Sequence, residues 1–328
     1  MASRRIGPFA VTPIGLGCMS LSHAYGAPPD EATAAALLHR ALDLGCNFLD
    51  TAALYGFGRN EALLGKVLKG RRNEYVLASK CGMTGVDGKR VIDGRPEMIL
   101  KTCDESLARL QTDTIDLYYL HRWDKSVPIE ESVGALADLV RAGKIRTIGL
   151  SEVSAATIGK AHAVHPIAAV QTEYSLWTRN PEIAVLDACR ALGIAFVAFS
   201  PLARAFLTGK LTDVSTLAER DIRRHMPRFQ PDTFAGNLKL LGGYAKLARE
   251  AGCTMAQLAL AWLLARGPHI VPIPGTTRIE HFEENWAARN VPLDAPMLEK
   301  LDALINAATV RGARYNAATQ AEIDTEIA

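Results

Sequence analysis

The sequence has few of the features that mark secreted, membrane-bound or nucleic-acid-binding proteins. Its six cysteines form no Cys-x-x-Cys pair and no Cys/His cluster with zinc spacing, which predicts a reducing compartment and no metal site. Lysine and arginine (37) nearly balance aspartate and glutamate (35) without a long run of one sign, so no nucleic-acid partner or membrane surface is predicted. The longest apolar run, near residues 256–265, reaches roughly half the length of a bilayer span. No secretory leader is recognisable either, and we expect a cytoplasmic protein.

What is present is the composition of a folded globular protein. Hydrophobic residues make up 48% and charged residues 22%, which excludes a disordered or low-complexity chain. The length of 328 residues suits one (β/α)₈ barrel with insertions as well as it suits two domains. No stretch has the composition of a linker, so we expect a single domain over residues 1–328.

Short apolar segments alternate with segments of helical periodicity along most of the chain. The strand candidates are eight apolar runs at residues 14–17, 48–49, 76–78, 115–120, 145–150, 168–170, 194–199 and 270–273. The predicted helices between them cover residues 30–44, 61–68, 96–110, 129–142, 154–164, 181–192 and 254–265. Strands that are apolar throughout indicate a parallel sheet buried on both faces. The alternation predicts either a (β/α)₈ barrel or a doubly wound sheet.

Several segments lie outside this alternation. Residues 4–11 predict a β-hairpin around a Gly-Pro turn, and residues 238–251 and 296–307 predict two further helices. A glycine-rich loop at residues 81–95 and a longer loop at residues 201–237 each follow the carboxyl end of a strand. In a barrel, that end carries the active site.

The motif Gly-Leu-Gly-Cys-Met-Ser at residues 15–20 invites comparison with a dinucleotide-binding fingerprint, since it follows a strand and offers two glycines. Its last position is Ser20 instead of glycine, and residues 21–29 have the composition of a turn where the fingerprint requires a helix. A tight turn is the better interpretation.

Four polar residues follow the ends of successive strands. Asp50 and Tyr55 follow the second strand, Lys80 follows the third and His121 follows the fourth. Each has an ordinary structural explanation on its own: a helix cap, a core aromatic, a solvated cation and a hydrogen-bonded histidine. Because the carboxyl ends of parallel strands meet at one rim, we expect all four to converge there.

The four side chains together suit carbonyl reduction. A tyrosine has a pKa of about 10 in water, and an adjacent ammonium lowers that value by stabilising the phenolate. Lys80 would play this part for Tyr55, and Asp50 would hold Lys80 charged and oriented. Tyr55 would then protonate a carbonyl oxygen as a hydride reaches the carbon, while His121 hydrogen-bonds the same oxygen.

From about residue 6 to about residue 307 the chain resembles the aldo-keto reductases. The set Asp50, Tyr55, Lys80 and His121 is similar to the family's catalytic residues in type, order and spacing. Further similarities are Gly-Leu-Ser at 149–151, Gln171, Ser-Pro-Leu at 200–202, Leu-Thr-Gly-Lys at 207–210, Pro-Gly-Thr-Thr at 274–277 and Glu-Asn at 284–285. The resemblance implies an α/β fold, a (β/α)₈ TIM barrel with the N-terminal β-hairpin, long loops at the C-terminal face and extra C-terminal helices.

The resemblance also implies NADPH bound in extended form across the barrel mouth, without a Rossmann fold. Ser151 and Gln171 would hold the carboxamide, and Phe199 would stack on the nicotinamide ring. The pyrophosphate would be contacted by Ser200, Leu202, Arg204 and Lys210. The 2′-phosphate would be surrounded by Gly275, Thr276, Thr277, Arg278 and His281, and the adenine by Glu284 and Asn285. Further contacts with the cofactor would come from Gly17, Met19 and Asp50. Independently, Arg278 lies beside a helix predicted to begin near Ile279, whose free N–H groups favour a phosphate.

Two residues depart from the family pattern. Glu152 stands where many relatives have an asparagine that contacts the carboxamide, and a glutamate here resembles one bacterial, fungal and plant subgroup. Thr277 stands where that subgroup often has a basic residue, which leaves Arg278, and with it Lys210 and Arg204, to neutralise the 2′-phosphate.

Two other functions fit parts of the sequence. A subunit that holds NADP(H) to sense redox state would need the cofactor site but not His121, and an unrelated barrel enzyme would bind no nicotinamide. The partner of the predicted enzyme is a small-molecule carbonyl compound, selected by the loops. Tyr25, Phe57, Trp123 and Trp177 suggest an aromatic-lined pocket, although core packing explains each of them too. No oligomeric state follows from the sequence.

Overall fold

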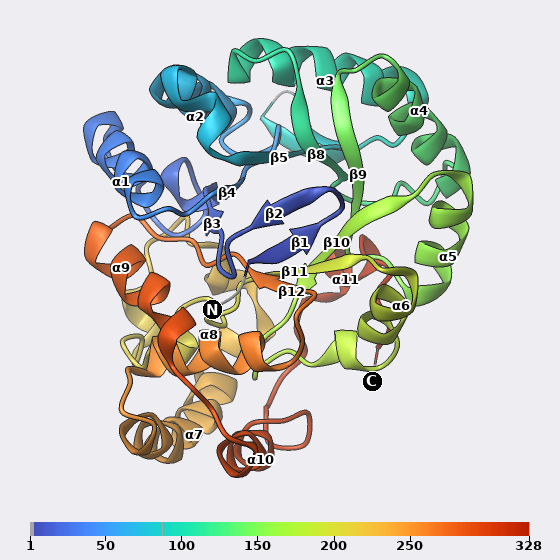
Figure 1. Cartoon of the computed structure of the whole chain (residues 1–328). Coiled ribbons are helices and arrows are strands. Elements are labelled where there is room, and N and C mark those ends of the chain that lie inside the picture. The colour runs from blue at the N-terminus through green and yellow to red at the C-terminus, as the bar shows by residue number, and fades with distance from the viewer. Residues whose placement is uncertain (1–2, 87, 328) are drawn as a thin grey trace.

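Eight parallel strands form the centre of the protein, as the computed structural model of residues 3–86 and 88–327 shows (Figure 1). The strands are β3 (Leu16–Gly17), β4 (Phe48–Asp50), β5 (Val76–Cys81), β8 (Ile115–Leu120), β9 (Ile145–Ser151), β10 (Ile167–Glu173), β11 (Ala195–Phe199) and β12 (Ile270–Pro272). Each pairs in parallel with its neighbour in chain order. The first and last strands also meet, because the Gly15 amide donates to the Pro272 carbonyl at 3.0 Å and Gly17 to Pro274 at 3.2 Å. The sheet therefore closes into the predicted barrel, and a doubly wound sheet is excluded.

The Gly-x-Gly pair at residues 15–17 serves this closure. A Cβ atom on Gly17 would lie 2.8 Å from the Ile273 carbonyl oxygen, and one on Gly275 would lie 3.0 Å from the oxygen of Gly17. Glycine is needed where two backbones approach so closely. A short 3₁₀ turn follows, Met19–Leu21, so the dinucleotide fingerprint is absent as expected.

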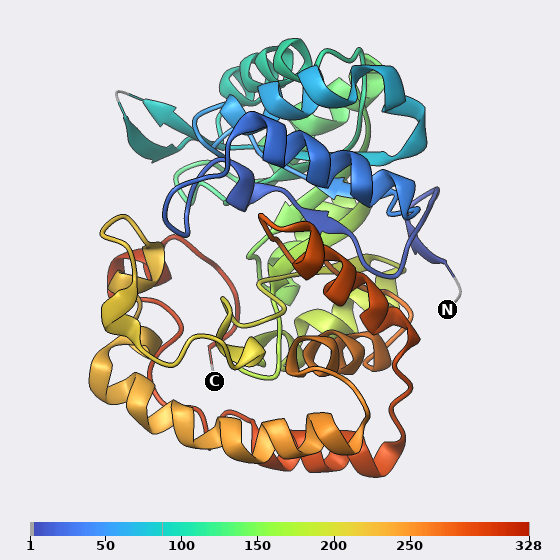
Figure 2. The same ribbon diagram turned by 90° about the vertical axis from the view of Figure 1, so that its left-hand side faces the viewer.

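Helices surround the barrel in the order that the apolar periodicity predicted. The seven that alternate with strands are α1 (Glu31–Asp43), α2 (Arg59–Leu68), α3 (Pro96–Leu110), α4 (Ile129–Arg141), α5 (Ala155–Val164), α6 (Val185–Leu192) and α8 (Met255–Ala265). Four others follow or interrupt the alternation: α7 (Pro231–Glu250), α9 (Ile279–Ala287), α10 (Ala295–Leu304) and α11 (Ala317–Ala321). α7 begins at Pro231 instead of residue 238, because proline is well suited to a first helical turn. It runs beside α10 (Figure 2).

The N-terminal hairpin, β1 (Arg4–Ile6) and β2 (Phe9–Val11), covers the amino-terminal end of the barrel (Figure 1). Its side chains Ile6 and Val11 join Phe48, Tyr119 and Val197 in a core inside the barrel. Closing this end leaves the opposite end of the barrel for a site.

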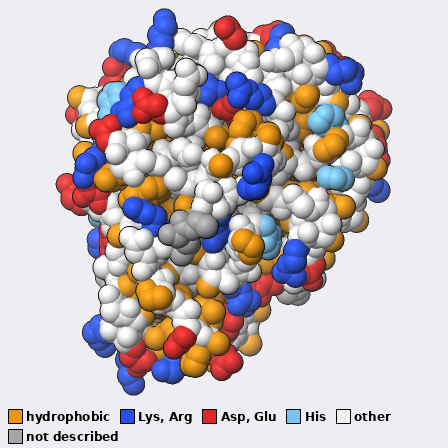
Figure 3. All heavy atoms as spheres, in the orientation of Figure 1, with side chains coloured by type: hydrophobic (Ala, Val, Ile, Leu, Met, Phe, Trp, Pro, Cys, Tyr) orange, Lys and Arg blue, Asp and Glu red, His pale blue; other side chains and the backbone are white. Residues whose placement is uncertain are grey.

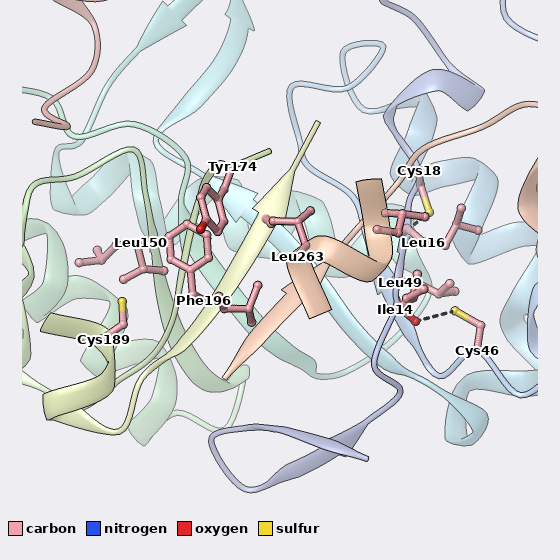
Figure 4. Packing of buried hydrophobic residues seen from close by; sticks show 14 of the residues in the cluster. Ile14, Leu16, Cys18, Cys46, Leu49, Leu150, Tyr174, Cys189, Phe196 and Leu263 are labelled. Carbon is pink, nitrogen blue, oxygen red and sulfur yellow. Dashed lines mark hydrogen bonds between the residues drawn. The ribbon is translucent and has the colours of Figure 1, made fainter. Parts of the chain in front are cut away.

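A second, larger core lies between the strands and the helices (Figure 4). Its buried cysteines are single thiols among apolar side chains. The Cys46 thiol points at the Ile14 carbonyl oxygen 3.8 Å away, and burial raises its pKa to about 11. Such a thiol is a packing group at neutral pH.

The segment predicted as a glycine-rich loop is a β-hairpin instead. β6 (Met83–Val86) and β7 (Lys89–Ile92) pair antiparallel and project from the carboxyl end of the barrel, away from the N-terminal hairpin (Figure 2). The glycines concealed the strands, because the hairpin pairs only with itself and needs no continuous apolar face.

The long loop after β11 consists largely of short 3₁₀ turns, at Phe206–Thr208, Val214–Thr216, Ile222–His225 and Pro227–Phe229. None of the helices in the described residues is long and apolar enough to cross a bilayer. On the face of the protein shown in Figure 3, basic and acidic side chains are interspersed, in keeping with the net charge of +2.

Candidate active site at the barrel mouth

A buried ion pair joins the ends of β4 and β5. Asp50 is the last residue of β4, and Lys80 lies next to last in β5. The Lys80 side chain is completely buried, and its Nζ donates to an Asp50 carboxylate oxygen and to the Thr51 carbonyl, the latter at 2.7 Å. Burial alone would lower the pKa of Lys80, but the adjacent Asp50 carboxylate outweighs it and raises that pKa. The predicted contact between Asp50 and Lys80 is thus present, and it favours the charged form of Lys80.

Tyr55 lies on the turn after β4 and completes the group. Its hydroxyl oxygen is 3.2 Å from Lys80 Nζ, and the ammonium is 4.8 Å from the ring centroid. Lys80 lowers the pKa of Tyr55, as the sequence predicted, but burial has the larger effect and the net pKa is raised. The expected net lowering of this pKa is thus wrong, and burial favours the protonated hydroxyl of Tyr55 at neutral pH.

His121 follows β8 directly and faces the same tyrosine. The rings of Tyr55 and His121 are 5.8 Å apart between centroids and nearly perpendicular. Burial, with the charges of Arg122 and Lys80, holds the pKa of His121 well below its usual value, so the imidazole is neutral. Its Nδ1 is buried and has no hydrogen-bond partner within the described residues.

Gln171 joins this group from β10. Its side-chain nitrogen donates to the second Asp50 oxygen at 2.7 Å, and both side chains are buried. The carboxylate of Asp50 is thus held by Lys80 on one oxygen and by Gln171 on the other. The sequence placed Gln171 on the cofactor, and the structure adds this contact with the ion pair.

One cavity of about 770 Å³ connects these residues with the predicted cofactor contacts. Tyr55, His121 and Asp50 line it, whereas Lys80 lies behind Tyr55 and does not. Every residue predicted to bind the cofactor also lines it, with the exception of Arg278. Arg278 precedes α9, and its backbone N–H donates to the Thr276 hydroxyl at 3.1 Å.

The backbone after β11 is strained beside the cavity. Ser200, Ala203, Arg204 and Ala205 all have positive φ, between 48° and 76°. Such conformations cost non-glycine residues on the order of 1–3 kcal/mol each and concentrate at ligand clamps. Successive N–H groups in turns of this kind form concavities that suit phosphate, so the segment fits the pyrophosphate that the resemblance assigns to it.

Arg204 differs from its prediction in one respect. Its guanidinium donates to the Glu173 carboxylate at 2.8 Å and to the Tyr25 hydroxyl at 3.2 Å. The side chain is 7% exposed, so the residue lines the cavity while its charge is neutralised by Glu173. At the far end of the cavity, Lys210 Nζ lies 3.4 Å from His281 Nε2 and 3.8 Å from the Glu284 carboxylate.

The structure gives Glu152 a function that the sequence did not indicate. Its carboxylate binds both terminal nitrogens of Arg314, which comes from the C-terminal segment, and accepts the backbone N–H of Glu173 at 3.0 Å. Arg314 Nε also donates to Glu173 at 3.1 Å. Glu152 itself has a φ of 58°. It therefore anchors the chain terminus.

Other residues that line the cavity were not predicted individually from the sequence. His23, Arg59 and Tyr315 line it, and the His23 ring is 5.6 Å from that of Tyr55. Of the four aromatic residues proposed for the pocket, Tyr25 and Phe57 line the cavity, whereas Trp123 and Trp177 do not. Trp177 is stacked on Phe206 in the core, with the ring centroids 4.1 Å apart, so the alternative explanation of core packing holds for this residue.

The fold and the site together define a (β/α)₈ barrel with an Asp, Lys, Tyr and His cluster at its mouth. A sequence profile described as "Aldo/keto reductase family" matches residues 13–306. The chain is 46% identical over 320 residues to "Aldo-keto reductase yakc [NADP(+)]" of Schizosaccharomyces pombe, covering 95% of this chain and 94% of that protein. The chain therefore belongs to the aldo/keto reductase family, and the resemblance seen in the sequence is confirmed.

Solved structures agree with this assignment. A glycerol dehydrogenase from Gluconobacter oxydans matches with a TM-score of 0.85 at 30% identity, over 92% of this chain and 94% of that one. An aldo/keto reductase from Klebsiella pneumoniae, solved with NADP and acetate, matches with a TM-score of 0.72 at 29% identity over 99% of both chains. The barrel is thus confirmed by structural comparison as well.

Proposed function

We propose that this oxidoreductase reduces an aldehyde or ketone to the alcohol with NADPH, and that Tyr55 donates the proton. The observation that carries the proposal is the contact of the Tyr55 hydroxyl with the Lys80 ammonium, 3.2 Å away, beside the neutral His121 and inside the cavity. The cofactor is that of the family and of the NADP(+) relative. We also propose that the chain forms one domain and acts in the cytoplasm, where its six unpaired thiols remain reduced.

The residues of the cavity fit the cofactor. Ser151 and Gln171 suit the carboxamide, Phe199 suits one face of the nicotinamide, and the strained segment after β11 suits the pyrophosphate. Lys210 and His281 lie together at the far end, where the 2′-phosphate belongs. NADPH, when bound, supplies the hydride.

The protein's own groups handle the proton and the carbonyl oxygen. Burial raises the pKa of Tyr55, so its hydroxyl carries a proton at neutral pH and can donate it to the oxygen. Lys80 stabilises the phenolate that remains, and Asp50 with Gln171 fixes Lys80 and its counter-charge. The neutral imidazole of His121 hydrogen-bonds the same oxygen and orients the carbonyl.

Substitution of Tyr55 by phenylalanine tests the mechanism. We expect Tyr55→Phe to lose about 10²–10⁴-fold in kcat, the usual contribution of a positioned acid, while NADPH binding, followed by fluorescence titration, stays within a factor of two to three of wild type. Wild-type turnover by this variant would falsify the mechanism. Tight NADPH binding without turnover of any carbonyl by the wild-type protein would favour the alternative, a subunit that only holds the cofactor.

In this proposal the preference for NADPH rests on two cations, Lys210 at the far end of the cavity and Arg278 beside the start of α9. We expect Arg278→Ala and Lys210→Ala each to weaken NADPH binding by about 10-fold, corresponding to about 1.4 kcal/mol, and to leave NADH binding nearly unchanged. Titration of each variant with both cofactors gives the ratio of the two dissociation constants directly. An equal loss of affinity for NADPH and NADH would show that these residues do not bind the 2′-phosphate.

A further inference from the structure

Charge is distributed unevenly along the cavity. Six lysine or arginine residues line it, but only Asp50 and Glu284 do so among the acidic residues. Four of the six cations have a carboxylate partner: Arg90 with Glu322, Arg204 with Glu173, Lys210 with Glu284 and Arg223 with Asp221. Arg59 and Arg122 have no such partner within residues 3–86 and 88–327.

Both unpaired arginines lie at the catalytic end. Arg122 follows His121, and its Nη1 donates to the His121 carbonyl at 2.7 Å and to the Ser151 hydroxyl at 3.3 Å. Its Nε is buried and has no acceptor in the described part of the chain. Arg59 begins α2, four residues after Tyr55, and its Nε donates to the Gly56 carbonyl at 2.9 Å.

The fields of these two arginines reach the residues around the reacting carbonyl. The charge of Arg122 contributes to the low pKa of His121, after burial, and Arg59 contributes in the same way to the lowered pKa of His23. The His23 ring is 5.6 Å from that of Tyr55. A partly enclosed space beside Tyr55 is thus bordered by two cations and two neutral imidazoles.

The cofactor does not account for this excess of positive charge. Its phosphates belong at the other end of the cavity, near Lys210 and the strained segment after β11, and its nicotinamide is neutral when reduced and cationic when oxidised. The Arg122 guanidinium is partly withdrawn from water, with a buried Nε that has no acceptor in the described residues, and such a cation without a counter-ion is costly. Arg59 is exposed at the edge of the cavity, and an anion placed between the two arginines would neutralise both charges. The remaining occupant of this end is the substrate.

We propose that the preferred substrate is an aldehyde or ketone that carries a carboxylate, held by Arg122 and Arg59 while its carbonyl faces Tyr55 and His121. This proposal rests on the proposed reductase function and names the class of its substrate. Guanidinium groups are suited to the task because they bind a carboxylate through two parallel N–H donors.

A matched pair of aldehydes tests the proposal, namely 4-formylbenzoate and its methyl ester, which differ in charge at the same position. For the wild-type enzyme with NADPH, we expect kcat/KM to be at least about 10-fold higher for the acid, equivalent to about 1.4 kcal/mol of preferential binding. The preference should fall as sodium chloride is raised, because part of it is electrostatic. Equal kcat/KM values for acid and ester would overturn the proposal.

Single variants then identify the residues. In Arg122→Gln and in Arg59→Gln, the ratio of acid to ester should fall to near one, mainly through KM for the acid. Arg59→Gln is the more independent variant, because Arg122 also touches Ser151. The control is Arg190→Gln on the outer helix α6, which removes the same charge from a side chain that is 64% exposed. If Arg190→Gln reduced the ratio as much, or if both mouth variants retained it, the two arginines would not form the site.

A binding measurement separates this proposal from the reductase function. Calorimetry of 4-methylbenzoate and 4-methylbenzamide with the NADP⁺-loaded protein requires no turnover. We expect 4-methylbenzoate to bind more tightly than 4-methylbenzamide, and Arg59→Gln to abolish this difference in affinity. If neither aldehyde is reduced but this difference is observed, the anion site stands and the proposed reaction fails. If both ligands bind equally, the anion site fails whatever the reaction.

Discussion

Two buried ionic clusters lie at the carboxyl ends of the barrel strands, and they differ in what they leave unsatisfied. The first consists of Asp50 and Lys80, with the Tyr55 hydroxyl 3.2 Å from the ammonium and open to the cavity. The second brings Glu152 and Glu173 together with Arg314 and Arg204. In the first cluster the ion pair supports a group that can exchange a proton, whereas in the second the charges neutralise one another.

The two clusters also differ in the chain segments that they join. Asp50 and Lys80 come from consecutive strands and Tyr55 from the turn after the first of them, whereas Arg314 meets Glu152 from 162 residues further along the chain. Arg314 holds the C-terminal segment over the cavity, where Tyr315 lines the wall, and its guanidinium lies 5.9 Å from the Phe199 ring centroid. Similar physical interactions thus serve the proposed chemical step in one place and the shape of the site in the other.

The largest effect is expected on removing the charge from the first cluster. Lys80→Met leaves Tyr55 without the ammonium that stabilises its phenolate, so kcat should fall by about 10²–10⁴-fold. NADPH binding should persist, because Lys80 does not line the cavity. The control Lys144→Met removes a lysine paired with Asp104 on the outside of the barrel. Turnover of Lys80→Met like that of the control would refute the role of the first cluster in proton transfer.

The converse change, Arg314→Ala in the second cluster, should affect stability more than chemistry. It leaves Glu152 buried without its partner, and breaking a buried pair typically costs about 3–5 kcal/mol. Denaturant unfolding should show this loss, while kcat for an uncharged aldehyde falls far less than in Lys80→Met. Arg314→Lys should recover only part of the stability, since an ammonium cannot bind Glu152 through two parallel donors. A loss of kcat as large as that of Lys80→Met would remove the distinction between the clusters.

Acid should weaken the second cluster through Glu173. Burial alone would raise the pKa of this carboxyl, but Arg204, Arg314 and Arg228 lower it from 4.5 to about 2. Between these values the unfolded chain binds a proton that the folded protein does not, so stability falls as the pH falls. The contribution is complete above pH 4.5 and amounts to about 3 kcal/mol at 1.36 kcal/mol per pKa unit. Denaturant unfolding of wild type and Glu173→Gln at pH 5, 4 and 3 should show the difference in their unfolding free energies narrowing as the pH falls. A constant difference would contradict the lowered pKa of Glu173.

The two clusters differ again in how far the sequence predicts them. The strands with long apolar runs, such as β8 at Ile115–Leu120, were found within a residue or two, because burial on both faces leaves a clear pattern. Asp50, Lys80 and His121 were located because each lies at or just beyond the end of a strand, and Tyr55 because it lies on the turn after β4. The barrel mouth was therefore predictable from local sequence alone.

The second cluster was not predictable in this way. Nothing near Glu152 indicates a partner in the C-terminal segment, and Arg204 was expected to face phosphate although Glu173 neutralises it. Contacts that join distant segments depend on the closed barrel, which the local pattern does not contain. The one available signal was Glu152, at a position where many relatives have asparagine. A search of the sequence for an oppositely charged partner would have included Arg314 in the C-terminal segment.

The smallest effect is expected at the other anchor of the C-terminal segment, the ion pair between Arg90 on β7 and Glu322. Arg314 and Arg90 hold the same segment, but the Arg90 side chain is 43% exposed and the Arg314 side chain only 6%. Exposed pairs contribute about 0–1 kcal/mol because water and salt screen them. Arg90→Ala should therefore change the unfolding free energy by less than about 1 kcal/mol, and 0.5 M sodium chloride should erase the difference, whereas the loss in Arg314→Ala should remain. If the two variants were equally destabilised and equally sensitive to salt, burial would not be what distinguishes the two anchors.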